Sequence, residues 1–204
     1  MVFRFACLLV IPWAVAHGLP QETNSTDSER EKDVYAIYSL MLTNPQTSHG
    51  PDNNERYWIA GTTAPGRPPE PCVRPPNARE ADFQQVLADY NRRKNTPRQL
   101  ERALSIPKPY VLLTADEVKE FMAVRSWPKP GREPDRERFR GVTDIFTLSD
   151  VYFNPRRTLA LTAISSWCGS LCALYQWKLF ENLDTGKWEE RQWVGCLTIA
   201  KNSR

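Results

Sequence analysis

The chain has 204 residues and a formal net charge of +3. Basic and acidic residues are nearly balanced, which argues against a dedicated nucleic-acid binder, because such proteins concentrate a basic excess. The 17 prolines against 9 glycines predict stiff, extended loops. The length is sufficient for one domain with a substantial core.

The first sixteen residues have the pattern of a secretory signal peptide. Arg4 gives a positive start, residues 5–13 form a short apolar stretch, and Ala14-Val15-Ala16 offers a small-residue cleavage site. The apolar stretch is shorter than the roughly 20 residues that span a bilayer. We therefore expect residues 1–16 to be removed, leaving a secreted or periplasmic protein with no transmembrane segment.

Four cysteines follow the signal peptide, an even number that favours two disulfides in an oxidising compartment. They are Cys72, Cys168, Cys172 and Cys196. Three pairings are open, and the short loop between Cys168 and Cys172 favours Cys168–Cys172 together with Cys72–Cys196. A redox role for Cys168 and Cys172 is the weaker interpretation, because thioredoxin-type pairs have two intervening residues at a helix N-terminus.

The first half of the mature chain is predicted to be mainly helical. A polar leader, residues 17–27, is expected to be disordered, and Ser28 with Glu31 then forms a capping box. Apolar residues at helical spacing give the following helix one buried face, and Pro45 ends it. That face consists of Val34, Ile37, Tyr38, Met41 and Leu42.

Three further helices are predicted from their capping residues. Asn77 is expected to cap a helix that ends in the basic run at residues 92–94. Thr96 and Pro97 predict the start of a short helix. Thr114 is expected to cap the last helix.

Two strands are predicted on either side of a proline-rich segment, residues 64–76. Residues 56–62 and 110–113 are rich in aromatic and β-branched side chains. Because proline lacks the backbone donor that a helix or central strand needs, residues 64–76 are expected to run extended along the surface, pinned there by Cys72. The proline-rich residues 126–140 are predicted to be an exposed loop.

The last third of the chain is predicted to be a β-meander. Alternating apolar residues indicate strands at 144–153, 158–167, 173–181 and 188–199, and short turns between consecutive strands make them antiparallel. Helices followed by a meander predict a single α+β domain over residues 28–204. We expect the N-terminal helices to pack on one face of an antiparallel sheet that ends in a three-stranded meander.

This last third also resembles an uncharacterised family of exported bacterial proteins. The resemblance is carried by residues 146–154, which end in Phe153-Asn154, by the Cys168-Gly169-Ser170-Leu171-Cys172 loop, and by Gly186-Lys187-Trp188. In that family a Phe-Asn turn, a Cys-Gly-x-Leu-Cys loop and a Gly-x-Trp turn follow in this order. The chain departs from the pattern at Tyr152, where relatives usually have glycine, and in its long proline-rich insert. The resemblance implies fold and export, and no particular chemistry.

Acidic residues provide the main candidates for catalysis, since His49 with a serine or cysteine nucleophile is a weaker interpretation than a solvated loop histidine. Glu80 with Asp82, and Asp116 with Glu117, lie where helix starts favour acids. A carboxylate pair in a cleft between helices and sheet is the basis of an alternative hypothesis, a small extracytoplasmic hydrolase. Asp184-Thr185-Gly186 matches the aspartic-protease triplet, but it lies in a predicted hairpin turn.

Tryptophans on the predicted strands are the remaining functional candidates. Exposed tryptophan commonly marks carbohydrate or protein contact, with core packing as the competing interpretation. We select Trp58, Trp177 and Trp193 as candidate binding residues. No catalytic residue, metal site or cofactor is predicted, and the basic residues between 92 and 102 are interpreted as a solvated helix face. The sequence therefore predicts an exported, non-catalytic module that binds an unknown ligand or extracellular partner, or serves a structural role.

Overall fold

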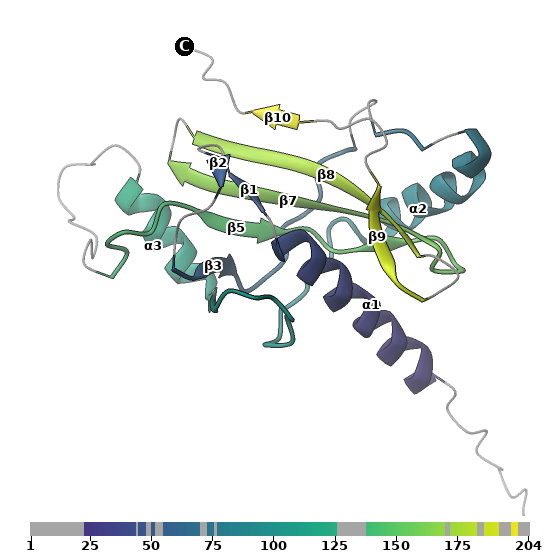
Figure 1. Cartoon of the computed structure of the whole chain (residues 1–204), viewed down its shortest axis with the longest axis horizontal. Helices are drawn as coiled ribbons and strands as arrows, with labels where there is room; N and C mark the ends of the chain where they lie inside the picture. The colour runs from purple at the N-terminus through teal and green to yellow at the C-terminus, as the bar shows by residue number, and fades with distance from the viewer. Residues whose placement is uncertain are drawn as a thin grey trace, which may run out of the picture.

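Three α-helices pack on one mixed β-sheet in the computed structural model (Figure 1), which confirms the predicted α+β fold. The structure describes residues 23–43, 45–47, 50–51, 55–69, 73–75, 77–125, 138–169, 172–182, 186–191 and 197–199. The helices are α1 (Thr23–Thr43), α2 (Glu80–Arg93) and α3 (Ala115–Arg125), with a 3-10 turn, η1 (Asn77–Arg79), before α2. The strands are β1 (Gln46–Thr47), β2 (Gly50–Pro51), β3 (Tyr57–Ala60), β4 (Tyr110–Leu113), β5 (Ile145–Leu148), β6 (Tyr152–Phe153), β7 (Leu159–Gly169), β8 (Cys172–Asn182), β9 (Trp188–Arg191) and β10 (Leu197–Ile199).

The main sheet has the order β10-β8-β7-β5-β3-β4, with β6 beside β7 and β9 beside β8. Its C-terminal strands are antiparallel, as predicted, and Leu161 of β7 lies opposite Leu179 of β8. The predicted last strand is divided into β9 and β10, which pair with different parts of β8. By contrast, β3 pairs in parallel with both β4 and β5, so the sheet is mixed. The chain between β3 and β4 contains α2, and a crossover of this kind returns the next strand in the parallel direction.

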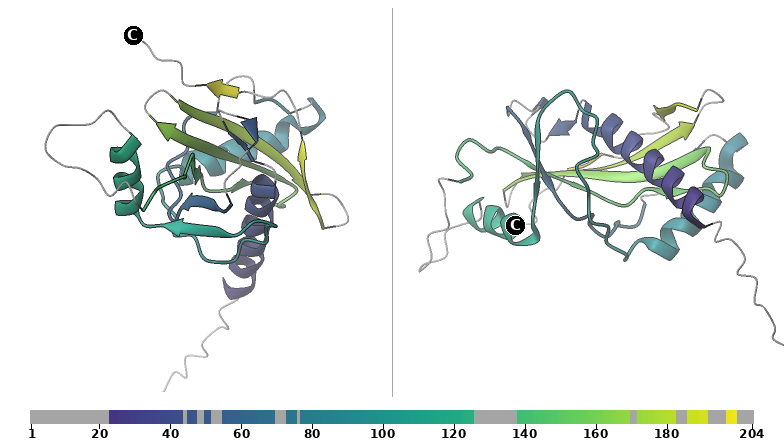
Figure 2. Two further views of the ribbon diagram at one scale, coloured as in Figure 1. Left: turned by 60° about the vertical axis from the view of Figure 1, so that its left-hand side comes forward. Right: turned by 90° about the horizontal axis from the view of Figure 1, so that it is seen from below.

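The alternation along β7 directs its residues into two different cores. Leu159, Leu161 and Ala163 pack with α2, whereas Ala160 and Ile164 pack with α1. Figure 2 shows α1 on one side of the sheet and α2 and α3 on the other. The prediction that the helices cover one face is therefore wrong. The physical reason is that β7 is apolar at both alternating sets of positions, which is typical of a strand buried on both faces.

Helix α1 is longer than the helix predicted from the sequence. The five apolar residues of its expected face, from Val34 to Leu42, are all buried, and the helix ends before Pro45 as expected. It begins at Thr23, however, and so includes residues 23–27 of the predicted disordered leader. The polar residues there have helix propensities only about 0.5 kcal/mol below alanine, which is too small a difference to stop the helix.

The short helix predicted from Thr96 does not form. Gln99 instead makes a β-bridge with Thr62. The N–H of Thr63 donates to the carbonyl of Arg98 at 2.9 Å. The N–H of Leu100 donates to the carbonyl of Gly61 at 2.8 Å. These long-range bonds use the backbone groups that a helix would need, so tertiary pairing overrides the local capping signal.

Two other boundaries also differ from the prediction. Asn77 opens η1 and does not cap α2, since the N-cap position is Arg79. The strand predicted at 144–153 is interrupted between β5 and β6, where Ser149 and Asp150 form a buried polar site.

The predicted cap of α3 at Thr114 is confirmed. The N–H of Thr114 donates to the Glu117 carboxylate at 2.6 Å, and the N–H of Glu117 donates to the Thr114 hydroxyl at 3.3 Å.

Candidate functional site

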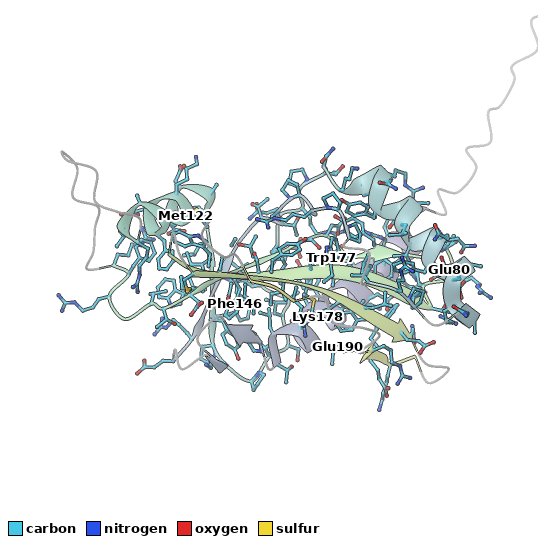
Figure 3. All side chains as sticks on the ribbon, turned by 90° about the horizontal axis from the view of Figure 1, so that it is seen from above. Glu80, Met122, Phe146, Trp177, Lys178 and Glu190 are labelled. Carbon is cyan, nitrogen blue, oxygen red and sulfur yellow. A yellow bond between two sulfur atoms is a disulfide. The ribbon has the colours of Figure 1, made fainter. Side chains whose placement is uncertain are left out.

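Four aromatic side chains form a cluster between α2 and the sheet. Tyr90 comes from α2, Tyr152 from β6, and Tyr175 and Trp177 from β8. The Tyr90 ring meets those of Tyr152 and Trp177 edge to face at 5.1 and 5.9 Å between centroids, and Tyr175 meets Trp177 at 6.0 Å. We call these four residues the aromatic cluster. Figure 3 shows Trp177 on the side of the sheet that faces α2, with Lys178 on the opposite side.

The described start of the proline-rich segment, residues 64–69, crosses this cluster, and we call it the strap. Its first residue is fixed to the sheet because the N–H of Ala64 donates to the carbonyl of Leu148 at 2.9 Å. The Tyr90 hydroxyl donates to the carbonyl of Gly66 at 3.1 Å. The N–H of Arg67 donates to the Tyr175 hydroxyl at 3.3 Å, and the Arg67 guanidinium lies 5.1 Å from the Tyr175 ring centroid. The strap thus combines backbone hydrogen bonds to tyrosine hydroxyls with a cation–π contact.

Glycine is required where the strap touches the cluster. A Cβ atom at Gly66 would lie 2.9 Å from a ring carbon of Tyr90, 3.1 Å from the hydroxyl oxygen of Tyr152 and 3.4 Å from Trp177. The first two distances are shorter than an unstrained contact, so a side chain at this position forces the strap and the rings to move apart.

A groove lies next to the aromatic cluster, between α2 and the described residues 68–69 and 73–74. Its volume is about 570 Å³, within the range of ligand sites. Its apolar lining consists of Pro68, Pro69, Val73, Phe83, Leu87 and Tyr90, and its polar lining of Arg74, Glu80, Gln84, Asn91 and Lys94. Because the α2 residues recur every three or four positions, they form one stripe of the helix.

Two hydrogen-bond donors in the aromatic cluster are buried without a partner in the part of the chain that the structure describes. They are the hydroxyl of Tyr152 and the indole Nε1–H of Trp177, in side chains that are 0% and 5% exposed. Burial raises the pKa of Tyr152 well above its usual value, so its hydroxyl remains protonated. By contrast, a third donor of the cluster, the Tyr90 hydroxyl, has a partner, because it donates to the carbonyl of Gly66 in the strap.

The buried acids near α2 are all bound to cations or to backbone groups. Asp82 accepts hydrogen bonds from Arg156 at 2.9 Å and from Asn154 at 3.1 Å. The pKa of Asp82 is lowered, mainly by the hydrogen bond from Arg156. Burial acts in the opposite direction, while the hydrogen bond from Asn154 and the charges of nearby arginines lower the pKa further. Asp89 accepts from Arg92 and from the N–H of Phe153. These contacts favour charged, structural carboxylates over a general acid, which must be protonated to act.

Asp150 occupies the centre of a second ionic site. Its carboxylate lies 2.6 Å from Arg93, 3.2 Å from Arg98 and 3.9 Å from Arg30, and Arg98 also pairs with Glu31. Arginines of the basic region between residues 92 and 102 are therefore partly buried in ion pairs. The interpretation of this region as a solvated helix face is wrong for Arg93 and Arg98, because Asp150 draws them into the interior.

The structure does not bring the three candidate tryptophans together. Trp58 is half-buried on β3 and packs against Phe139 in the cluster around α3. Trp177 is buried in the aromatic cluster, and Trp193 lies outside the described residues. Of the acidic pairs, Asp82 is buried while Glu80 lies exposed on the groove rim. Asp116 is exposed, and Glu117 caps α3.

The Cys168–Cys172 disulfide is confirmed, with the two Cα atoms 5.3 Å apart at the tip of the β7–β8 hairpin. Its position between two strands fits a structural role. Cys72 and Cys196 lie outside the described residues, as does Asp184, so the second pairing and the turn at Asp184 stay predictions.

Sequence reasoning missed several residues of this site, namely Tyr90, Tyr175, Gly66 and Arg67. The density of prolines was the available signal, but it does not show which surface a proline-rich segment covers. A second groove, of about 530 Å³, lies between α1 and residues 101–105. Its lining of serine, alanine and charged residues contains one aromatic side chain, Tyr35, and the aromatic cluster therefore marks the groove along α2 as the better candidate.

Comparisons of the chain with protein-family models, curated proteins and solved structures found no match. The resemblance to exported bacterial proteins therefore stays a prediction. Among the described helices, none has both the length and the apolar character needed to cross a membrane. Within the same residues, histidine, cysteine and acidic side chains do not gather in a group of three that would hold a metal ion.

Proposed function

We propose that this protein is an exported, non-catalytic module that binds an extended segment of a partner protein in the groove along α2. The groove itself carries the proposal. Its apolar lining and polar rim match the anatomy of protein interfaces, in which a hydrophobic centre is surrounded by polar residues. Export is supported by the signal-like N-terminus and by the Cys168–Cys172 disulfide.

The dimensions of the groove favour an extended segment over a compact small molecule. Its lining residues along α2 run from Glu80 to the C-cap residue Lys94, which at 1.5 Å per residue is about 20 Å. An extended chain of about six residues covers that distance at roughly 3.3 Å per residue. The binding of a partner also requires no catalytic group, and the buried acids beside the groove are engaged in ion pairs.

A matched pair of leucine substitutions tests this proposal. Leu87 is half-buried in the groove, whereas Leu40 is 42% exposed on α1, across the sheet. A phage-displayed library of random peptides is selected on the purified protein, and the affinities of the enriched peptides are measured. We expect Leu87→Arg to weaken them at least about tenfold and Leu40→Arg to leave them unchanged.

Two results would contradict the proposal. One is that no peptide is enriched above an empty support. The other is that Leu87→Arg and Leu40→Arg have the same effect on the enriched peptides, which would place binding elsewhere. Circular dichroism of both variants checks that neither substitution unfolds the protein.

A further inference from the structure

The aromatic cluster already holds a proline-rich, arginine-bearing segment, namely the strap. Pro65, Pro68 and Pro69 flank the contact, Gly66 gives its carbonyl to Tyr90, and Arg67 stacks on Tyr175. Proline-rich segments bind aromatic-lined grooves in this manner, because they are pre-extended and lose little entropy on docking. The chemistry of the strap therefore fits the surface that it covers, and a segment of the same chemistry from another protein would fit it too.

The strap satisfies the cluster incompletely. Tyr90 finds a carbonyl, but the hydroxyl of Tyr152 and the indole N–H of Trp177 do not, although both are buried. Burying an unpaired donor is unfavourable. A segment whose carbonyls reach these two donors would gain interactions that the strap does not make.

The strap is also weakly attached beyond its first residue. Residues 65–69 belong to no helix or strand, and Arg67 and Pro68 are exposed. The described hydrogen bonds that hold this part of the strap are those of Tyr90 and Tyr175. Such a segment can detach without breaking the pairing of the sheet.

We infer that the aromatic cluster is a binding site for an extended proline-rich, arginine-bearing segment of a partner protein, which replaces the strap. This inference rests on the proposed function and specifies its ligand. Tyr90 belongs to both the cluster and the groove, so a segment bound on the cluster lies next to the α2 side of the groove. Pro68 and Pro69, which also line the groove, move away with the strap. Because the strap competes from within the same chain, it lowers the apparent affinity of the partner segment.

The test uses a fluorescein-labelled peptide with the sequence of residues 63–69, Thr-Ala-Pro-Gly-Arg-Pro-Pro. In the protein, Gly66→Ala places a methyl group 2.9 Å from the Tyr90 ring, and we expect this clash to displace the strap. We expect the peptide to bind Gly66→Ala about tenfold more tightly than the wild type by fluorescence anisotropy. A peptide with alanine in place of its glycine should not bind, because its own methyl group meets the same rings.

A second pair of variants, each added to Gly66→Ala, tests the geometry of the site. Tyr90→Phe removes the donor to the Gly66 carbonyl and should weaken the peptide about fivefold. Tyr110→Phe is the matched control, since the Tyr110 hydroxyl accepts a hydrogen bond from Leu104 at 3.3 Å, away from the cluster. It should leave the affinity unchanged.

Several outcomes would overturn the inference. These are equal peptide affinity for wild type and Gly66→Ala, equal binding of the alanine peptide, or equal effects of Tyr90→Phe and Tyr110→Phe. Dimers of Gly66→Ala in sedimentation without peptide would also overturn it, since they assign the site to a second copy of the chain. If library peptides depend on Leu87 but the strap peptide fails to bind Gly66→Ala, the inference fails while the proposed function stands. If the strap peptide binds through Tyr90 while Leu87→Arg has no effect, the groove proposal alone fails.

Discussion

Asp150→Asn removes the negative charge at the most crowded ionic site of the described structure. The Asp150 side chain is 3% exposed, and the side chains of Arg30, Arg93 and Arg98 around it are 19%, 26% and 18% exposed. The pKa of Arg30 is lowered, first by burial and second by the positive charge of Arg93. The second cause reflects how close the cations lie to one another. The carboxylate thus joins α1, α2 and the chain segment before β4.

The expected loss of unfolding free energy is about 3 kcal/mol. Asparagine keeps the size of the side chain and the acceptor for the N–H of Val151 at 2.9 Å, so packing is retained. The loss comes from leaving the arginines without their buried counter-ion, which costs about 3–5 kcal/mol in other proteins. The lower end applies here because the guanidinium groups keep some contact with water and Arg98 retains Glu31.

Urea unfolding at pH 7, followed by tryptophan fluorescence, measures this loss. Glu31→Gln is the control, because Glu31 binds the same Arg98 but is 41% exposed, and we expect it to cost about 0.5 kcal/mol. Asp150→Asn with a loss below about 1 kcal/mol, or equal to that of Glu31→Gln, would refute the view that burial makes this ion pair strong.

Three further predictions follow from individual contacts. The pKa of Asp82 is lowered in the folded protein, so its contribution to stability is complete above about pH 5 and is lost as the pH falls through the folded pKa. Asp82→Asn should therefore reduce the acid-side slope of stability against pH, and an unchanged slope would contradict the assignment. Tyr152→Phe removes a buried hydroxyl without a described partner and should stabilise the protein by about 1 kcal/mol, whereas a clear drop in Tm would reveal a partner. Replacing Cys168 and Cys172 by serine should lower the free energy of unfolding by about 2 kcal/mol, the chain-entropy value for so short a loop. The reduced wild type should have the same stability as this double variant, and a different stability would contradict the assignment.

The parts of the fold that were predictable are those encoded by local pattern. The alternation of β7, the capping box at Thr114 and the short loop between Cys168 and Cys172 each involve residues close in sequence. Alternation predicts which residues share a face but not what covers that face. The placement of α1 and α2 on opposite sides of the sheet therefore had to come from the structure.

The aromatic cluster was not predictable for the same reason. Tyr90, Tyr152 and Trp177 come from three elements that are distant in sequence, and Gly66 reaches them from a segment without regular structure. Similarly, the capping signal at Thr96 is genuine locally, but Thr62 and Gln99 pair across the fold and prevent the helix. In both cases long-range contacts outweigh the local preference.

Helices cover both faces of the sheet that contains the meander. α1 lies on one face, and α2, α3 and the strap lie on the other, where Trp177 is buried. If a partner segment replaces the strap, as we infer, it gains access to Trp177 on this second face. Binding and stability then depend on different residues. Changes at Gly66 alter the fit of the strap and should act on affinity, because the strap contributes little regular hydrogen bonding. Changes at Asp150 alter the contacts that join the helices and should act on stability. A variant of Gly66 that lost as much stability as Asp150→Asn would show that the strap is part of the core.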